Sequence, residues 1–152
     1  MVLPFLFFTI CLLPQLATAQ ADTLAVVGNN GKPGSQGHMV QLTLMNLREI
    51  AGVQLTVKTS HEFLAIDSVR TTARSSGMMP HWNGQNGKII LVDFNARHTI
   101  NAGFGPVLEV FYSVSAKAPS GMVPLKMMDV VLADPKGNAV SVVSVDGTFN
   151  IQ

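Results

Sequence analysis

Apolar and polar residues alternate in short runs along most of the chain, and this alternation is typical of β-strands that bury one face. In the segment from His38 to Asn46, for example, Val40, Leu42 and Leu44 alternate with polar residues. Further strands are predicted at residues 23–28, 52–59, 65–72, 88–95, 106–115, 122–133, 139–145 and 148–151, with a short one near 81–83. Strands at roughly ten-residue spacing, separated by turn-forming residues, predict an all-β fold: an antiparallel β-sandwich of about nine strands with jelly-roll topology.

Two of the predicted strands are apolar on both faces. They read Ile89-Ile90-Leu91-Val92-Asp93-Phe94 and Val107-Leu108-Glu109-Val110-Phe111-Tyr112. We expect the core to be filled by Val92, Phe94, Leu108, Val110, Tyr112 and Val114, which leaves Leu91, Val107 and Phe111 pointing outward beside Asp93, Asn95 and Glu109. Two interpretations remain open: these outward residues are covered by loops or are ordinary scattered apolar surface, or they form a protein-docking patch.

The first residues of the chain have a different pattern. An almost continuous apolar run from Met1 to Leu13 is followed by Pro14 and then by Ala17-Thr18-Ala19. This is the layout of a secretory signal peptide over residues 1–19, with cleavage after Ala19 or Ala21. The run of about a dozen residues is shorter than the roughly 20 that span a bilayer, so we expect cleavage rather than a retained anchor. The prediction is therefore a secreted, extracellular or cell-surface protein with one domain, residues 22–152.

Composition then narrows the function classes. The only cysteine, Cys11, lies in the predicted signal peptide, so the mature domain must be stabilised by core burial rather than by disulfides. The net charge is +1, and there is no run of basic residues with interleaved aromatic residues, which makes nucleic acid a poor candidate partner. A low charge density suits a protein that docks onto another surface.

The candidate chemical groups do not form a catalytic constellation. The histidines lie far apart, without the close spacing of metal ligands: His38, His61, His81 and His98. No Gly-x-Ser-x-Gly nucleophile motif is present, and Glu62, Asp67 and Glu109 lie on different predicted elements rather than as a carboxylate pair. The segment 134–138, Asp-Pro-Lys-Gly-Asn, is interpreted as a hairpin turn rather than a calcium loop. We expect a protein that is not an enzyme and that binds no metal or cofactor itself.

A set of short motifs follows one another in a fixed order from about Leu24 to Ile151. They are Gly31-Lys32-Pro33-Gly34, Leu42-x-Leu44-x-Asn46-Leu47, Gly52-Val53-Gln54-Leu55, Phe63-Leu64, Ile100-x-x-Gly103-x-Gly105-Pro106, Leu108-x-Val110-x-Tyr112-x-Val114, Ala118-Pro119-x-Gly121, Val131-Leu132-Ala133-Asp134 and Asp146-Gly147-x-x-Asn150-Ile151. Each is a common turn or strand, but the ordered set resembles a cohesin domain, the receptor module of cellulosome-type assemblies. Thr59-Ser60-His61 departs from this resemblance, because cohesins usually have a Tyr-Asp-Pro-like corner there.

The resemblance implies a nine-stranded jelly roll that docks a calcium-loaded dockerin module of another secreted protein, in extracellular polysaccharide degradation or cell-surface assembly. The calcium would belong to the dockerin. In cohesins the contact face is the sheet that contains the third, fifth, sixth and eighth strands. Mapped onto this chain, the face would carry Gln54, Thr56, Lys58, His81, Asn83, Leu91, Asp93, Asn95, Val107, Glu109 and Phe111. Leu91 and Phe111 would be the buried anchors, framed by hydrogen bonds from polar neighbours.

A carbohydrate-binding module is the alternative, because jelly rolls of this kind often bind polysaccharide. Trp82 is the one convincing stacking residue, with polar residues on either side of it. A subunit of a cell-surface layer or an adhesin is a third interpretation and shares the protein-docking logic.

Overall fold

The computed structural model describes residues 21–59 and 62–152; the predicted signal peptide lies outside the described residues, as do Ser60 and His61. The strands are β1 (Asp22–Val27), β2 (Asn29–Gly31), β3 (His38–Asn46), β4 (Gly52–Thr59), β5 (Leu64–Thr71), β6 (Met79–Asn83), β7 (Lys88–Val92), β8 (Gly103–Val114), β9 (Gly121–Ala133), β10 (Ala139–Val140), β11 (Val142–Val145) and β12 (Gly147–Ile151). A 3-10 helix, η1 (Ala73–Ser75), follows β5. In the described part of the chain no helix is long and apolar enough to cross a membrane.

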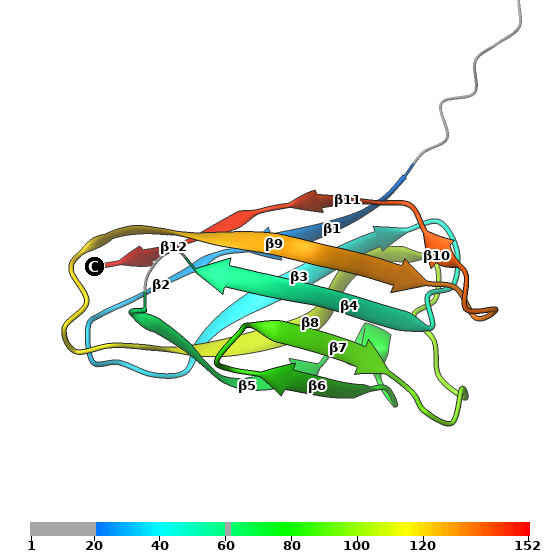
Figure 1. Cartoon of the computed structure of the whole chain (residues 1–152), viewed down its shortest axis with the longest axis horizontal. Helices are drawn as coiled ribbons and strands as arrows, with labels where there is room; N and C mark the ends of the chain where they lie inside the picture. Colours follow the sequence, from blue (N-terminus) through cyan, green and yellow to red (C-terminus); the bar gives the residue numbers. More distant parts are fainter. Residues whose placement is uncertain (1–20, 60–61) are drawn as a thin grey trace, which may run out of the picture.

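The strands form two sheets that pack face to face (Figure 1). The five-stranded sheet has the order β11-β1-β3-β8-β5, and the seven-stranded sheet has the order β2-β12-β9-β4-β7-β6, with β10 paired to β9. Most neighbours are antiparallel, whereas the pairs β1–β11 and β2–β12 are parallel. The prediction of an all-β sandwich is confirmed.

The inward faces of both sheets form one hydrophobic core. The alternation within β3 and β4 buries every second side chain, including Leu42, Leu44 and Leu55. Tyr112 of β8 and Phe149 of β12 are the largest fully buried side chains, and their ring centroids lie 6.4 Å apart. Burying one large aliphatic or aromatic side chain stabilises a fold by about 1.5–3 kcal/mol, so this shared core joins the two sheets.

Strand positions follow the sequence prediction closely, with two informative differences. The predicted strands 38–46 and 52–59 are confirmed to the residue. The predicted strand 139–145 is divided, because the chain pairs with β9 at Ala139–Val140 and then crosses to pair with β1 from Val142. The predicted strand 88–95 ends at Val92, since Asp93 begins a loop.

In the two strands that are apolar on both faces, some side chains point to the opposite side from the one that the sequence predicted. Leu91 is fully buried, and the outward residues of β7 are Ile90 and Val92. The register explains this, because Leu91 lies opposite Val53 and Ile89 lies opposite Leu55, and both partners on β4 face the core. Phe94, expected in the core, lies beyond the strand and is exposed.

In β8 the predicted burial is confirmed for four residues, and the predicted exposure is wrong for one. The expected core residues, Leu108, Val110, Tyr112 and Val114, are all buried. Val107 is also fully buried, although it was expected to point outward. A β-bulge explains this difference: the β3–β8 register shifts between Leu42 and Thr43, which places Val107 at the irregularity.

Arg74 of η1 fastens one end of the five-stranded sheet. Its guanidinium donates to the carbonyl oxygens of Leu44 (2.7 Å), Gly105 (3.1 Å) and Asn101 (2.9 Å) and to Oδ1 of Asn46 (2.7 Å). Gly105 has φ = 145°, and a Cβ atom there would lie 3.2 Å from Cδ of Arg74. A glycine at this position lets the arginine pass close to the strand.

Candidate functional site

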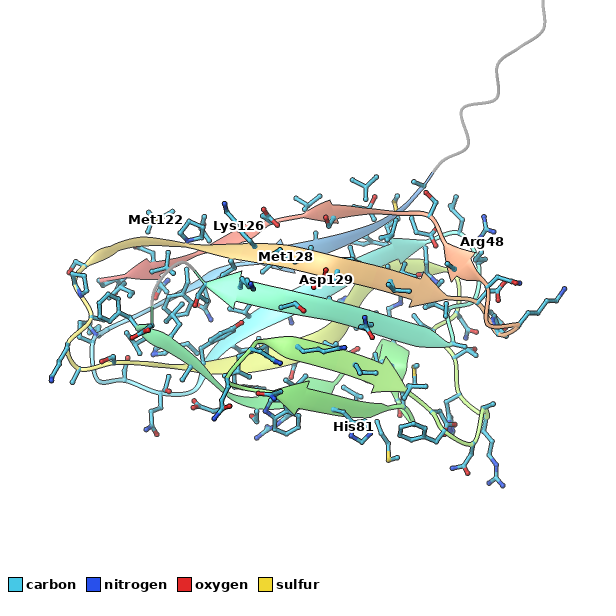
Figure 2. All side chains as sticks on the ribbon, in the orientation of Figure 1. Arg48, His81, Met122, Lys126, Met128 and Asp129 are labelled. Carbon is cyan, nitrogen blue, oxygen red and sulfur yellow. The ribbon has the colours of Figure 1, made fainter. Side chains whose placement is uncertain are left out.

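Four neighbouring strands of the seven-stranded sheet leave their outer side uncovered. They lie in the order β9-β4-β7-β6, and Figures 1 and 2 look directly onto this side, where no other described element crosses in front of them. We call the outward side chains of these four strands the four-strand face. A broad uncovered sheet surface is a natural surface for a macromolecular partner.

One half of the four-strand face is apolar. The β6–β7–β4–β9 register places Met79 opposite Val92, and it aligns His81, Ile90, Gln54 and Val131 in the next row. Gly52 lies opposite Val92 and Ala133, so the first row is flat there. Met79 and Val131 are exposed, and Ile90 and Val92 are half-buried. We call Met79, Ile90, Val92 and Val131 the apolar half; Gln54 lies between Ile90 and Val131, and the apolar surface continues from Val92 to Val131 through Gly52 and Ala133.

The other half of the four-strand face is basic. Lys58 of β4 lies directly opposite Lys126 of β9, and Lys88 of β7 lies opposite Thr56, two residues from Lys58. All three lysines are exposed. Within the described residues the only ion pair is between His98 and Asp93, so none of these three lysines has an acidic partner there. Like charges that face each other across a strand pair repel, so this lysine cluster costs the free domain stability.

A β-bulge in β9 keeps both halves on one face. Gln54 pairs with Val131 and Thr56 pairs with Met128, so β9 has an extra residue between them. Asp129, at the bulge, has φ = 52°, a left-handed conformation that non-glycine residues seldom adopt. Figure 2 shows Lys126, Met128 and Asp129 along β9 on the viewed face. The extra residue restores the alternation, and both Met128 and Val131 point outward.

The loop after β7 adds an aromatic side chain at the edge of the four-strand face. Phe94 is 70% exposed, and its ring meets the His81 ring edge-on with centroids 5.4 Å apart. Asp93 holds the loop in place. Its carboxylate accepts hydrogen bonds from the backbone N–H groups of Asn95 (2.9 Å), Arg97 (2.9 Å) and His98 (3.0 Å), and it lies 2.8 Å from Nδ1 of His98. The backbone hydrogen bond from Asn95 and the side-chain hydrogen bond with His98 lower the pKa of Asp93 to about 2.

The structure separates the site residues expected from the sequence into three groups. Gln54, Thr56, Lys58, His81 and Asn83 lie on the four-strand face, and Asn95 is exposed in the adjoining loop. Asp93, Leu91 and Val107 are buried, Asp93 as the organiser of its loop and the other two in the core. Glu109 and Phe111 lie on the outer side of the five-stranded sheet, where the Arg70 guanidinium lies 4.7 Å from the centre of the Phe111 ring. The expectation that Leu91, Val107 and Phe111 share one face with β4 is wrong.

The strand assignment explains this error. The sequence mapping used 106–115 as the eighth strand, but β8 belongs to the five-stranded sheet and β9 lies beside β4. In the predicted order 81–83 is the fifth strand, 88–95 the sixth and 106–115 the seventh, so the eighth strand was 122–133 and not 106–115. The residues missed as a result, or through the inverted facing of β7, are Met79, Lys88, Ile90, Val92, Phe94, Lys126, Met128 and Val131.

Trp82, the expected sugar-stacking residue, lies at the edge of the seven-stranded sheet. It is 43% exposed and pairs with the buried Ile89, so it alternates to the side opposite His81. A shallow hollow of about 190 Å³ is lined by His81, Trp82, Asn83, Asn86, Lys88 and Ile90. Trp82 and Phe94 therefore do not form one flat aromatic platform.

A second, deeper pocket lies away from the apolar half, between the ends of the two sheets. It has a volume of about 550 Å³, and Glu62 is the only acidic residue among its described lining, which includes Lys58, Gln85 and Tyr112. The Tyr112 hydroxyl is buried and has no hydrogen-bond partner among the residues that the structure describes, and burial raises its pKa. In the described residues no three His, Cys, Asp or Glu side chains are grouped so that they could hold a metal ion.

No protein-family model and no curated protein matches the sequence. Solved structures of cohesins match the fold. A type I cohesin–dockerin complex from Clostridium thermocellum, with the OlpA cohesin, matches with a TM-score of 0.74 and 13% identity over 88% of this chain and 100% of that chain. A cohesin of scaffoldin B from Acetivibrio cellulolyticus, solved with a dockerin, gives 0.71 and 15% over 88% and 100%. A non-cellulosomal cohesin from the archaeon Archaeoglobus fulgidus gives 0.71 and 19% over 88% and 92%. The chain has the fold of these cohesin domains, as the sequence resemblance predicted.

Proposed function

We propose that this protein is a secreted, non-catalytic binding module that docks a dockerin-type module of another protein through the four-strand face. The observation that carries the proposal is the uncovered apolar half beside the lysine cluster, on the strands β9, β4, β7 and β6. The fold supports it, because two of the similar cohesins were solved in complex with dockerins. The predicted signal peptide supports an extracellular or cell-surface location.

The binding mechanism follows from the two halves of the four-strand face. The partner removes water from Met79, Ile90, Val92 and Val131, and this apolar burial supplies most of the affinity. Gln54, which is half-buried between the two halves, offers hydrogen bonds that fix the position of the partner, whereas Thr56 beside it is buried. A standard interface buries roughly 1,600 Å² in total, with a few central residues dominating the binding energy.

Calcium enters the proposal only through the partner. The described residues of this chain offer no grouped metal ligands, so any calcium dependence of binding belongs to the dockerin-type module. Assembly of extracellular polysaccharide-degrading enzymes, or of cell-surface complexes, is the context in which such a module would act.

The test uses purified dockerin modules encoded in the same genome, with binding measured by calorimetry in calcium and in chelator. Val131→Asp and Val27→Asp form a matched pair, because Val131 is 44% exposed on the four-strand face and Val27 is 50% exposed on the other sheet. We expect calcium-dependent binding by the wild type, a loss of about 100-fold or more in Val131→Asp, and no change in Val27→Asp. Absence of binding to every dockerin, or equal losses in both variants, would contradict the proposal.

A second candidate function is polysaccharide binding through Trp82. The observation that favours it is the exposed indole beside the hollow lined by Asn83, Asn86 and Lys88. Retention on insoluble cellulose or another insoluble glycan that Trp82→Ala removes and Val131→Asp leaves intact would favour this function over dockerin docking. Equal retention of all three proteins would exclude a role for Trp82.

A further inference from the structure

The edge strands of the two sheets differ in how they are protected from pairing with another chain. An edge strand exposes unpaired N–H and C=O groups, and natural proteins protect such edges with proline, charge, bulges or very short strands. The five-stranded sheet ends at β5 and β11, and the seven-stranded sheet ends at β6 on one side and at β2 and β10 on the other.

Most of these edges carry a recognisable protection. β6 contains Pro80, which has no N–H group to donate. β5 has a bulge between Ile66 and Ser68 and carries the charged residues Asp67 and Arg70. β2 has three residues and β10 has two, which is too short for a stable pair with another chain.

β11 (Val142–Val145) is short, with four residues, but it carries no charge, no proline and no bulge, and its pairing with β1 is unbroken over all four residues. The stretch from Ala139 to Val145 contains no charged residue, no proline and no glycine, and four of its seven residues are valine. Val143 and Val145 point outward and are about half exposed. A short β-branched, uncharged edge of this composition is the kind of segment that pairs with another strand.

The hydrogen bonds between β11 and β1 show which backbone N–H and C=O groups of β11 are free to pair with another chain. β11 pairs with β1 in parallel, and the Asp22 N–H donates to the Ser141 carbonyl oxygen at 3.3 Å. In a parallel ladder the peptide groups of alternate residues point in opposite directions, so the N–H and C=O groups of Val142 and Ser144 point away from β1. Among the described residues no strand pairs with β11 on that side, and Figure 1 shows β11 at the outer edge of the molecule.

We propose that β11 pairs with β11 of a second copy of this chain, antiparallel about a twofold axis, so that the two five-stranded sheets become continuous. The pairing is self-complementary, because β11 brings no charges together and offers the same three valines and one serine from both copies. The four-strand face is unsuited to self-association, since a second copy would bring two lysine clusters near each other. This inference goes beyond the proposed function and does not depend on it.

The residues on the outer face of the five-stranded sheet also favour pairing with a second copy of this chain. The register aligns Val143 with Thr23, Met45 and Phe104 and aligns Val145 with Ala25 and Thr43. Neither row contains a charged residue. Pairing of β11 with its copy extends both rows across the twofold axis without opposing like charges.

The test is sedimentation equilibrium on the protein purified from expression of the full chain, from about 10 µM to about 1 mM, the range in which a weak dimer forms. Ser144→Pro is the diagnostic variant. Because the Ser144 N–H points away from β1, proline removes no hydrogen bond within the monomer but blocks pairing with a second copy. Ser144→Ala, which keeps the N–H group, is the matched control.

We expect the weight-average mass of the wild type and of Ser144→Ala to rise toward twice the monomer mass, while Ser144→Pro stays monomeric with an unchanged melting temperature at low concentration. If Ser144→Pro lowers that melting temperature, Val143→Lys replaces it and is expected to be monomeric. A wild type that stays monomeric throughout, or a dimer that persists in the blocking variant, would overturn the inference. The affinity of a single site for a dockerin, measured in solution below the dimer concentration, reports on the proposed function alone, because β11 is not part of the four-strand face.

Discussion

Asp93 shows how one buried carboxylate positions part of the binding surface. It accepts three backbone N–H groups and lies against His98, and the loop that it holds presents Phe94 beside His81. The sequence analysis expected Asp93 to point outward from a strand, but Asp93 begins the loop after β7 and is buried. In the proposed docking, Asp93 would therefore act by positioning Phe94 rather than by direct contact.

Asp93 also predicts a specific acid sensitivity. Because its folded pKa of about 2 lies below the ordinary value of 3.8, its contribution to stability is present above that ordinary value and is lost as the pH falls toward 2. We expect Asp93→Asn to be less stable than the wild type at neutral pH and to lose less stability between about pH 4 and about pH 2. Urea unfolding at a series of pH values measures both. Parallel pH profiles for the two proteins would show that Asp93 is not responsible.

Arg74 is the second single residue whose role is measurable. Charge-assisted hydrogen bonds contribute more than neutral ones, and Arg74 makes four contacts that join β3, β8 and the loop before β8. We expect Arg74→Met to lower the free energy of unfolding by about 3 kcal/mol. Arg48→Met, at an exposed arginine in the β3–β4 connection, is the control and is expected to be neutral. Equal effects of the two variants on chemical unfolding would argue against the bracing role.

At the scale of strands, alternation in the sequence is sufficient to predict which side chains face the core where only one face of the strand is apolar. β3 and β4 have a clean period of two, so their bounds and their inward residues were predictable. β7 is apolar on both faces, and its facing is decided by pairing with Val53 and Leu55, which periodicity cannot reveal. The bulges at Asp129 and beside Val107 likewise arise from pairing between distant strands.

The same limit explains what was missed in the candidate site. The sequence resemblance predicted a docking face that includes the strands now seen as β4 and β6, and these two strands do share a sheet, but the sheet membership of β8 and β9 depends on long-range pairing. The lysine cluster is a product of that pairing too. Lys58 and Lys126 are far apart in the chain and become neighbours only because β4 and β9 are adjacent.

The lysine cluster predicts opposite effects on stability and on binding. Lys58→Glu replaces a repelling pair across β4 and β9 with an attracting one, so we expect the free energy of unfolding to rise by about 0.5 kcal/mol at low salt. The gain should shrink as salt screens the charges. Thermal unfolding in a salt series tests this, and Lys117→Glu, at an exposed lysine outside the four-strand face, is the control. A Lys58→Glu variant that is no more stable than the control would show that the cluster carries no repulsion.

The partner side of this prediction concerns association kinetics. A protein that keeps a repelling cluster on an uncovered face is suited to a partner with acidic groups opposite it. We therefore expect Lys58→Glu to lower the association rate constant for a dockerin that binds the wild type, and to change the dissociation rate constant less. We also expect the wild-type association rate constant to fall as the salt concentration rises. An association rate independent of salt would indicate a neutral partner surface at this position.

At the scale of the whole molecule, the two proposed surfaces lie on different sheets and act together. A twofold axis perpendicular to the five-stranded sheet places the outer faces of both five-stranded sheets on one side of the dimer. The four-strand faces of the two copies then lie on the opposite side and point in the same direction. Such a dimer can hold two partners that are themselves attached to one surface.

This arrangement predicts an effect of partner density that a monomer cannot produce. On a sensor densely coated with the dockerin, wild-type protein bound at a concentration that favours the dimer should dissociate about tenfold more slowly than Ser144→Pro, because both sites of a dimer engage at once. On a sparsely coated sensor the two proteins should dissociate at the same rate, since each site then acts alone. Surface plasmon resonance at two coating densities gives both comparisons. Identical dissociation at high density would separate the two proposals: the four-strand face would still bind, but the dimer would not present both faces toward one surface.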